Sequence, residues 1–223
     1  PSVLNYVPAI KEITSRGGWV VRMGDNTMKP LPSMENVIDY PLTKYKSEYM
    51  DLCLIKNCRF FIATQSGLVE FATLASKKIL ETNIYDQTST HGRGILQHLY
   101  SKRDKRYLSI RELLSMDLMN KLIVGLSDDN YVFTENTEGE ISKAVLEYMD
   151  FLTNDDLPLT SKQKDYIKYC KKMGRSMVMD TSKRITSPRT HSDEEEMEAR
   201  YKHAVQLEAK ERTLCVGFME ENW

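Results

Sequence analysis

The hydrophobic positions in residues 1–90 follow two periods in turn, which predicts helices alternating with short strands. The first segment repeats apolar residues at helical spacing and ends at two glycines: Val3, Tyr6, Val7, Ile10, Ile13, then Gly17-Gly18. Apolar runs predict strands near residues 19–23, 35–39, 59–63 and 78–81. Between them the pattern predicts a mostly buried helix over 46–57, and a helix over 67–76 with Leu68, Phe71, Ala72 and Ala75 facing inward. This alternation is typical of a parallel sheet covered on both faces.

The pattern changes after this region. Residues 88–106 are polar and rich in Gly, His and Arg, which predicts a loop or an active-site surface. Helices are expected over 110–119, 161–172 and 192–212, and a strand near 131–134. A further amphipathic helix begins at Asn136 or Thr137 and has Glu138 and Glu140 in its first turn, where acidic side chains are favourable.

Together these elements predict an α/β fold: a doubly wound, mostly parallel sheet, one Rossmann-like half of a two-domain fold, which the strand near 131–134 completes. We place a nucleotide-sugar-binding domain at residues 1–155. Residues 156–223 are expected to form a helical carboxyl-terminal extension that packs on or near it.

Charge and hydropathy argue against a nucleic-acid partner and against a membrane-spanning segment. The formal net charge of the 223 residues is -1, so no overall charge attracts nucleic acid, and we expect no nucleic-acid partner. No apolar run approaches the roughly 20 residues that span a bilayer, and no signal peptide is visible. We therefore expect no transmembrane segment and a cytoplasmic protein, or one bound peripherally at the inner face of the membrane.

Cysteines and histidines do not suggest a metal centre. The four cysteines contain no CxxC pair and the four histidines have no spacing such as HExxH; these residues are Cys53, Cys58, Cys170, Cys215, His91, His98, His191 and His203. Reduced, buried thiols are the expectation, with no bound metal.

The most informative turn is Thr64-Gln65-Ser66-Gly67, where an apolar strand leads directly into a helix. The carboxyl edge of a parallel sheet is where ligands bind, and a helix start offers unpaired N–H groups to a phosphate. Ser66 adds a hydroxyl, and Gly67 permits close approach to the backbone. On the turn alone, a plain helix cap is the stronger interpretation, because most such turns bind nothing.

Asp51 is the one charge in the apolar run 49–55. An ionised carboxylate buried without partners is costly, so Asp51 must face solvent, accept hydrogen bonds or meet a ligand. A local contact is as good an interpretation as a functional one.

Other polar residues stand at the ends of the predicted strands. Arg22 and Gly24 stand at the end of the first strand, and Asp39 and Tyr40 at the end of the second. Arg22 suits a diphosphate, or alternatively a salt bridge with Asp25, and Gly24, Asp39 and Tyr40 are candidates for nucleotide contacts. Glu81 ends a later strand, and Glu70 lies one turn into the helix after Ser66, so both are candidates for sugar contacts. The basic segment His91-Gly92-Arg93-Gly94 is a candidate phosphate-side loop.

Three segments in combination carry a resemblance: GGWVVRMGD over 17–25, VIDY over 37–40 and MDLCLIKNCRFFIATQSGL over 50–68. They resemble a family of bacterial glycosyltransferases linked to surface-polysaccharide synthesis and, more distantly, the donor-binding half of GT-B fucosyltransferases. The resemblance covers residues 9–83 strongly, and 136–149 and the end at Phe218-Met219 weakly.

The resemblance implies transfer of a sugar from a nucleoside-diphosphate sugar to a glycan or lipid-linked acceptor. Asp51 would meet the nucleotide and Ser66 the donor phosphate, with no cofactor and no metal; no DxD-like acidic pair ends a strand. The family also has an upstream His-x-Arg motif and an amino-terminal acceptor domain that this chain lacks. We therefore expect a portion of a longer enzyme, or a degenerate or split member, that transfers no sugar alone and whose catalytic residues remain unassigned. Two alternatives stay open: a non-catalytic nucleotide- or phosphosugar-binding module, and a sugar-nucleotide epimerase-like α/β enzyme.

Overall fold

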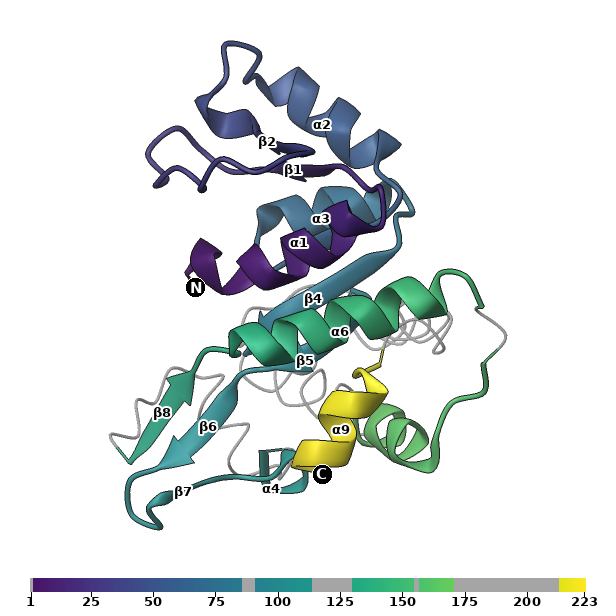
Figure 1. Ribbon diagram of the computed structural model, residues 1–223. Helices are drawn as coiled ribbons and strands as arrows, with labels where there is room; N and C mark the ends of the chain where they lie inside the picture. Colours follow the sequence, from purple (N-terminus) through teal and green to yellow (C-terminus); the bar gives the residue numbers. More distant parts are fainter. Residues whose placement is uncertain (1, 86–90, 114–129, 155–156, 171–212) are drawn as a thin grey trace, which may run out of the picture.

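Helices and strands alternate along the first part of the chain (Figure 1), in a computed structural model that describes residues 2–85, 91–113, 130–154, 157–170 and 213–223. The helical elements are η1 (Val3–Tyr6), α1 (Val7–Ser15), η2 (Tyr40–Leu42), α2 (Glu48–Asn57), α3 (Gly67–Leu74), α4 (Ile110–Leu113), α6 (Glu138–Phe151), α9 (Val216–Asn222) and a helix over 161–170. The strands are β1 (Val20–Arg22), β2 (Val37–Asp39), β3 (Phe61–Ala63), β4 (Ile79–Ile84), β5 (Arg93–Leu96), β6 (His98–Ser101), β7 (Arg106–Tyr107) and β8 (Tyr131–Thr134).

Two of the sheets are parallel. Strands β1 and β2 pair in one, with Arg22 opposite Asp39, and β3, β4 and β5 pair in the other, with Ala63 opposite Glu81. The strands predicted near 19–23, 35–39, 59–63 and 78–81 are confirmed, and so is their parallel pairing, but they lie in two separate sheets and not in the single sheet that was predicted. A mixed α/β fold is therefore established for the described residues.

The third sheet is antiparallel and corrects two predictions. Strand β8 pairs antiparallel with β6, and β7 lies on the other side of β6, so residues 131–134 do not extend the parallel sheet. The polar region 88–106 was predicted as a loop or an active-site surface, but β5 and β6 lie in it and β7 begins at its end. Arg93 is buried by a partner distant in the sequence, because it lies over the ring of Phe151, 3.7 Å from its centroid.

Hydrophobic residues pack against both faces of β4. Alternate side chains of a strand point to opposite faces, so Leu80 and Ile79 enter different clusters. Leu80 and Ile84 pack with α1 and α6 in the main core, while Ile79 packs with Ala72 and others from α2 and α3 in a smaller one. Figure 1 shows α1 and α6 in front of the strands and α3 behind them.

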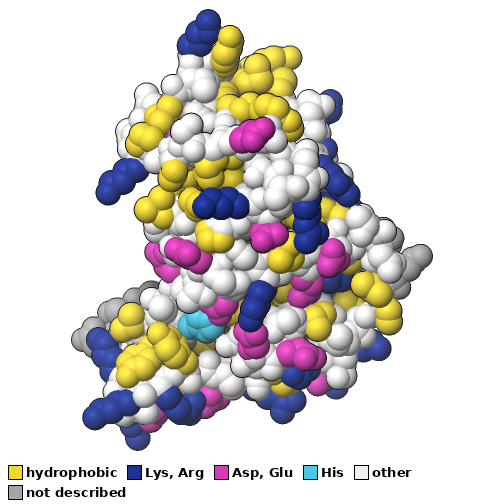
Figure 2. Space-filling model, in the orientation of Figure 1, with side chains coloured by type: hydrophobic (Ala, Val, Ile, Leu, Met, Phe, Trp, Pro, Cys, Tyr) yellow, Lys and Arg dark blue, Asp and Glu magenta, His cyan; other side chains and the backbone are white. Residues whose placement is uncertain are grey.

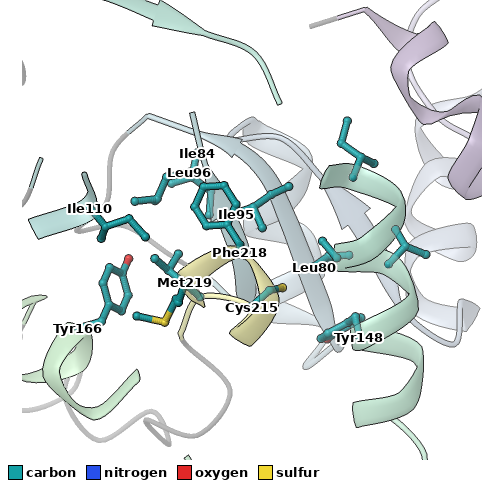
Figure 3. Packing of buried hydrophobic residues seen from close by; sticks show 14 of the residues in the cluster. Leu80, Ile84, Ile95, Leu96, Ile110, Tyr148, Tyr166, Cys215, Phe218 and Met219 are labelled. Atoms are coloured by element: carbon teal, nitrogen blue, oxygen red, sulfur yellow. The ribbon is translucent and has the colours of Figure 1, made fainter. Parts of the chain in front are cut away.

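The carboxyl-terminal residues complete the main core. Leu214 forms a parallel bridge with Gly94 at the free side of β5, and α9 packs against α6. Figure 3 shows Cys215, Phe218 and Met219 among residues of β4 and β5. The described part of 156–223 thus shares its core with residues 1–155; the domain boundary itself lies at residues outside the description and stays a prediction.

Local sequence explains where the helices begin. Thr137 caps α6 in a capping box with Glu140, as predicted for Asn136 or Thr137. Helix α2 is more exposed than predicted, because Ile55 is its one buried residue. In α3 the prediction was wrong for Phe71, which is 48% exposed, whereas Val69 and Ala72 face the core. The helix expected over 110–119 is seen as α4 up to Leu113, while its remainder and the helix expected over 192–212 fall outside the described residues.

Candidate functional site

The start of α3 is an exposed strand-to-helix junction. Ser66 occupies the N-cap position in extended conformation, yet its hydroxyl makes no capping bond to any described residue. The first backbone bond of the helix runs from Val69 N to Ser66 O at 3.0 Å, so the N–H groups of Gly67 and Leu68 precede it. A Cβ at Gly67 would meet nothing within 4 Å. The junction thus offers a hydroxyl and helix-end donors beside open space.

Gln65 in the same turn has a structural contact. Its Oε1 accepts a hydrogen bond of 3.0 Å from the backbone N–H of Tyr85, just after β4. The side chain therefore ties the end of β3 to the end of β4. Thr64 precedes it and is partly buried.

The carboxyl ends of β4 and β5 are closed by internal hydrogen bonds. Asn136 accepts from Asn83 N at 2.6 Å, donates from Nδ2 to Leu96 O at 2.7 Å, and donates from its own N–H to Asn83 Oδ1 at 2.8 Å. The hydroxyl of Tyr6 lies 2.6 Å from the hydroxyl of Thr82. Because these groups satisfy one another, the end of β3 is the more open part of this sheet edge.

Glu70, His91 and Glu81 form a charged cluster beside α3. The carboxylate of Glu81 accepts from the backbone N–H of His91 at 2.6 Å and lies 3.3 Å from its ring Nδ1. The other ring nitrogen, Nε2, lies 3.0 Å from Glu70 Oε1. The side chains of Glu81, His91 and Glu70 are 0%, 14% and 65% exposed, so the cluster runs from the interior to the surface.

Both ring nitrogens of His91 face carboxylate oxygens. An ionised carboxylate only accepts hydrogen bonds, so this arrangement favours the ring that carries both protons. Hydrogen bonding to Glu81 raises the pKa of His91; burial acts in the opposite direction, and the charges of Glu81 and Glu70 add to the rise. Of the two candidates for sugar contacts, Glu70 faces solvent, whereas the buried Glu81 carboxylate is occupied by His91.

Arg22 and Asp39 meet directly at the ends of β1 and β2. Arg22 Nε donates to Asp39 Oδ1, Arg22 Nη1 donates to Lys29 O at 3.1 Å, and Asp39 Oδ2 accepts from Leu31 N at 2.8 Å. Arg22 is nearly buried, and its Nη2 has no hydrogen-bond partner among the described residues. The alternative pairing of Arg22 with Asp25 is not seen; Asp25 accepts from Thr27.

Asp51 is held by Lys46. Lys46 Nζ donates to Asp51 Oδ2, and Lys46 also lies over the ring of Tyr40, 5.3 Å from its centroid. Tyr40 is buried and exchanges two 3.0 Å hydrogen bonds with the backbone of Ser47. Asp51 Oδ1 is buried, and no described residue donates to it. One oxygen of this carboxylate is therefore satisfied and the other is not.

Gly24 has a structural reason for being glycine. Its φ of +143° is one that side chains rarely adopt, and a Cβ there would lie 2.3 Å from the sulfur of Met28. Met23, just before it, packs in the same cluster as Leu68 of α3, so the end of β1 lies near the start of α3.

The structure thus brings some predicted residues together and leaves others apart. Arg22 pairs with Asp39, and Glu70 and Glu81 meet through His91, but the two groups belong to separate sheets. Sequence reasoning did not single out Lys46; a lysine five residues before an otherwise lone aspartate was the available signal.

The described residues give no support to a metal site or a membrane span. Within the described ranges, no group of three or more His, Cys, Asp or Glu residues is arranged to hold a metal ion, and metal independence stays a prediction. None of the described helices has the length and apolar character needed to cross a bilayer. Figure 2 shows carboxylates and basic side chains interspersed over the lower part of one face and hydrophobic side chains gathered in the upper part.

Comparison of the chain with protein-family models, curated proteins and solved structures gives no match. The residues themselves must therefore support any functional assignment.

Proposed function

We propose that this chain is the donor-binding portion of a GT-B-type glycosyltransferase, which transfers a sugar from a nucleoside-diphosphate sugar to a glycan or lipid-linked acceptor in cell-surface polysaccharide synthesis. The donor diphosphate would lie over residues 64–67, and the nucleotide would reach Asp51. Parallel strands with helices against both faces of β4 support a doubly wound arrangement of this kind.

One observation carries the proposal: the Ser66 hydroxyl stands at a helix N-cap without capping it. An N-cap serine in a purely structural role accepts a hydrogen bond from the following turn. Ser47 does so at the start of α2, where its Oγ accepts from Met50 N at 3.2 Å. At α3 the hydroxyl, the helix-end N–H groups and the open space over Gly67 suit an anionic ligand instead.

Asp51 supports the nucleotide end of the site. Lys46 holds one carboxylate oxygen, which fixes the orientation of the group, and the other oxygen lacks a donor among the described residues. A ribose or base N–H or O–H would supply that donor after a small side-chain movement. No metal or cofactor enters this proposal; helix-end donors and the serine would stabilise the departing diphosphate.

The test compares Ser66→Ala with Ser47→Ala. Calorimetric titration with UDP, GDP, ADP, CDP and dTDP, and with the matching nucleosides, gives affinity, and melting curves give stability. Ser66→Ala should weaken diphosphate binding roughly ten- to a hundredfold, since a hydrogen bond to a charged group contributes about 1.5–3 kcal/mol, while nucleoside binding and stability stay unchanged. Ser47→Ala should lower stability by about 0.5–2 kcal/mol and leave affinity unchanged.

Two results would contradict the proposal. In one, Ser66→Ala lowers the melting temperature and leaves affinity unchanged; in the other, the chain binds no nucleoside diphosphate at all. Asp51→Asn should weaken the nucleoside as well as the diphosphate. Incubating the chain with the matching nucleotide sugars, with and without acceptor glycans, should give no turnover, and robust transfer by the chain alone would contradict the expectation that it is only the donor-binding portion.

A further inference from the structure

The cations at the ends of β1 and β2 are already neutralised. Arg22 is paired with Asp39, and Lys46 with Asp51. A diphosphate at the start of α3 would therefore have to draw its positive charge from elsewhere. His91 is the cation beside the first turn of that helix, because it contacts Glu70 there.

We propose that His91 donates a hydrogen bond from Nε2 to the diphosphate of the bound nucleotide, that Glu81 positions its ring, and that Glu70 occupies Nε2 when no ligand is bound. This inference rests on the proposed function and deepens it by naming the side chain that neutralises the leaving diphosphate.

Glu81 has the properties of a positioning residue. It is fully buried and contacts both the backbone N–H and the ring Nδ1 of His91, which fixes the ring and directs the opposite nitrogen outward. A buried carboxylate under an imidazole orients the ring and stabilises its charged form.

Glu70 has the properties of a placeholder. Its side chain is 65% exposed, and helical side chains tilt toward the amino end of their helix, which here is the proposed phosphate site. The carboxylate at Nε2 is an anion at hydrogen-bond distance, the same kind of acceptor as a phosphate oxygen. Exchange of one anion for another requires only that an exposed side chain rotate outward.

Diphosphate binding at this site should depend on whether His91 is protonated. The charged groups that act on the ring are Glu81 from β4 and Glu70 from α3, and both raise its pKa. His91 is a cation below its folded-state pKa and neutral above it. Diphosphate affinity should therefore fall as pH rises through that pKa.

The experiment is calorimetric titration of the whole chain with UDP, GDP, ADP, CDP and dTDP and with the matching nucleosides. His91→Asn should weaken diphosphate binding roughly ten- to a hundredfold and leave nucleoside binding unchanged. Glu70→Gln should strengthen diphosphate binding by about two- to tenfold, because the competing anion is gone. His98→Asn is the matched control, since His98 also pairs with a glutamate, Glu140, at 2.5 Å, but in the third sheet. It should leave affinity unchanged.

The outcomes separate this inference from the proposed function. If wild type binds and Ser66→Ala weakens binding while His91→Asn does not, the role of His91 is wrong and the proposed function stands. If Glu70→Gln weakens binding as much as His91→Asn, Glu70 is itself a ligand contact and the placeholder role is wrong. If the wild-type chain binds no diphosphate, both fail. Should His91→Asn not fold, wild-type affinity from pH 7 to 9 decides: a fall supports the inference and a flat profile overturns it.

Discussion

Replacing the buried Asn136 by alanine should destabilise the protein more than replacing an exposed asparagine by alanine. The Asn136 side chain is fully buried and satisfies two backbone groups, the N–H of Asn83 and the carbonyl of Leu96, at 2.6 and 2.7 Å. Both groups are themselves buried, so alanine leaves a donor and an acceptor without partners. Each such group costs about 1–3 kcal/mol, which gives about 2–6 kcal/mol for the substitution. The free energy of unfolding of a domain of this kind is about 5–15 kcal/mol in total.

Urea unfolding of wild type and Asn136→Ala measures the loss directly, with an unchanged denaturant slope expected if the fold is retained. Asn57→Ala is the control, because Asn57 makes one exposed side-chain bond, to Cys53 O at 2.8 Å, and should change stability by no more than about 0.5 kcal/mol. A loss below about 1 kcal/mol in Asn136→Ala would refute the reasoning. It would mean that the ends of β4 and β5 are not closed by this network and that a ligand has access there.

Two further predictions concern hydrogen-bonded carboxylates. Glu147 accepts hydrogen bonds from the first two backbone amides of α9 at 2.6 and 2.9 Å. Glu147→Ala should therefore lower the free energy of unfolding by about 1.5–3 kcal/mol and speed hydrogen exchange at those amides. Glu221→Ala, which removes an exposed ion pair, should do neither, and equal exchange in both variants would contradict the prediction. Hydrogen bonding to Arg106 lowers the pKa of Glu112 to about 2, so the Glu112 carboxyl should titrate near that value by NMR. Its stabilisation is present above pH 4.5, is lost as pH falls toward 2, and is small because Glu112 is 41% exposed; a midpoint near 4.5 would rule the pairing out.

The parallel strands were predictable because their signal is local. Residues 20–22, 37–39 and 61–63 lie in short, largely apolar runs, and each is a strand within its predicted range. Strand β4 begins with the apolar pair Ile79-Leu80 and continues through polar residues to Ile84, beyond its predicted end at residue 81. The order of pairing within each sheet follows from short crossovers between neighbours in the sequence. Arg22 and Asp39, which the sequence places at the ends of successive strands, stand opposite each other in the register.

Strand β5 of the second sheet and the strands of the third sheet were not predictable in this way, because their partners are distant in the sequence. Strand β5 contains Arg93 and Gly94, which look like loop residues. Arg93 is buried only because α6 supplies Phe151 to stack on, and Gly94 is paired with Leu214 from the end of the chain. A hydrophobic pattern also does not encode the direction of pairing, so residues 131–134 were recognised as a strand but assigned to the wrong sheet.

The candidate site was likewise predictable only in part. Ser66 and Gly67 follow from the strand-to-helix pattern, but the contact between Glu81 and His91 does not, since it depends on how β5 enters the sheet. Arg22 and Asp39 end their strands as predicted, whereas Glu81 does not, because β4 continues to Ile84 and buries it.

The pairing of Arg22 changes how phosphate recognition should be understood. Arg22 is nearly buried and holds Asp39, which in turn holds the backbone of Leu31. Moving the guanidinium to a ligand would leave a partly buried carboxylate without its cation, at a cost of several kcal/mol that one phosphate contact does not offset. Arg22 is therefore expected to organise the ends of β1 and β2, while backbone N–H groups, the Ser66 hydroxyl and His91 bind the anion. A site of that composition carries a single, titratable positive charge beside two carboxylates. It should therefore discriminate among phosphate-containing ligands by geometry and by pH more than by total charge.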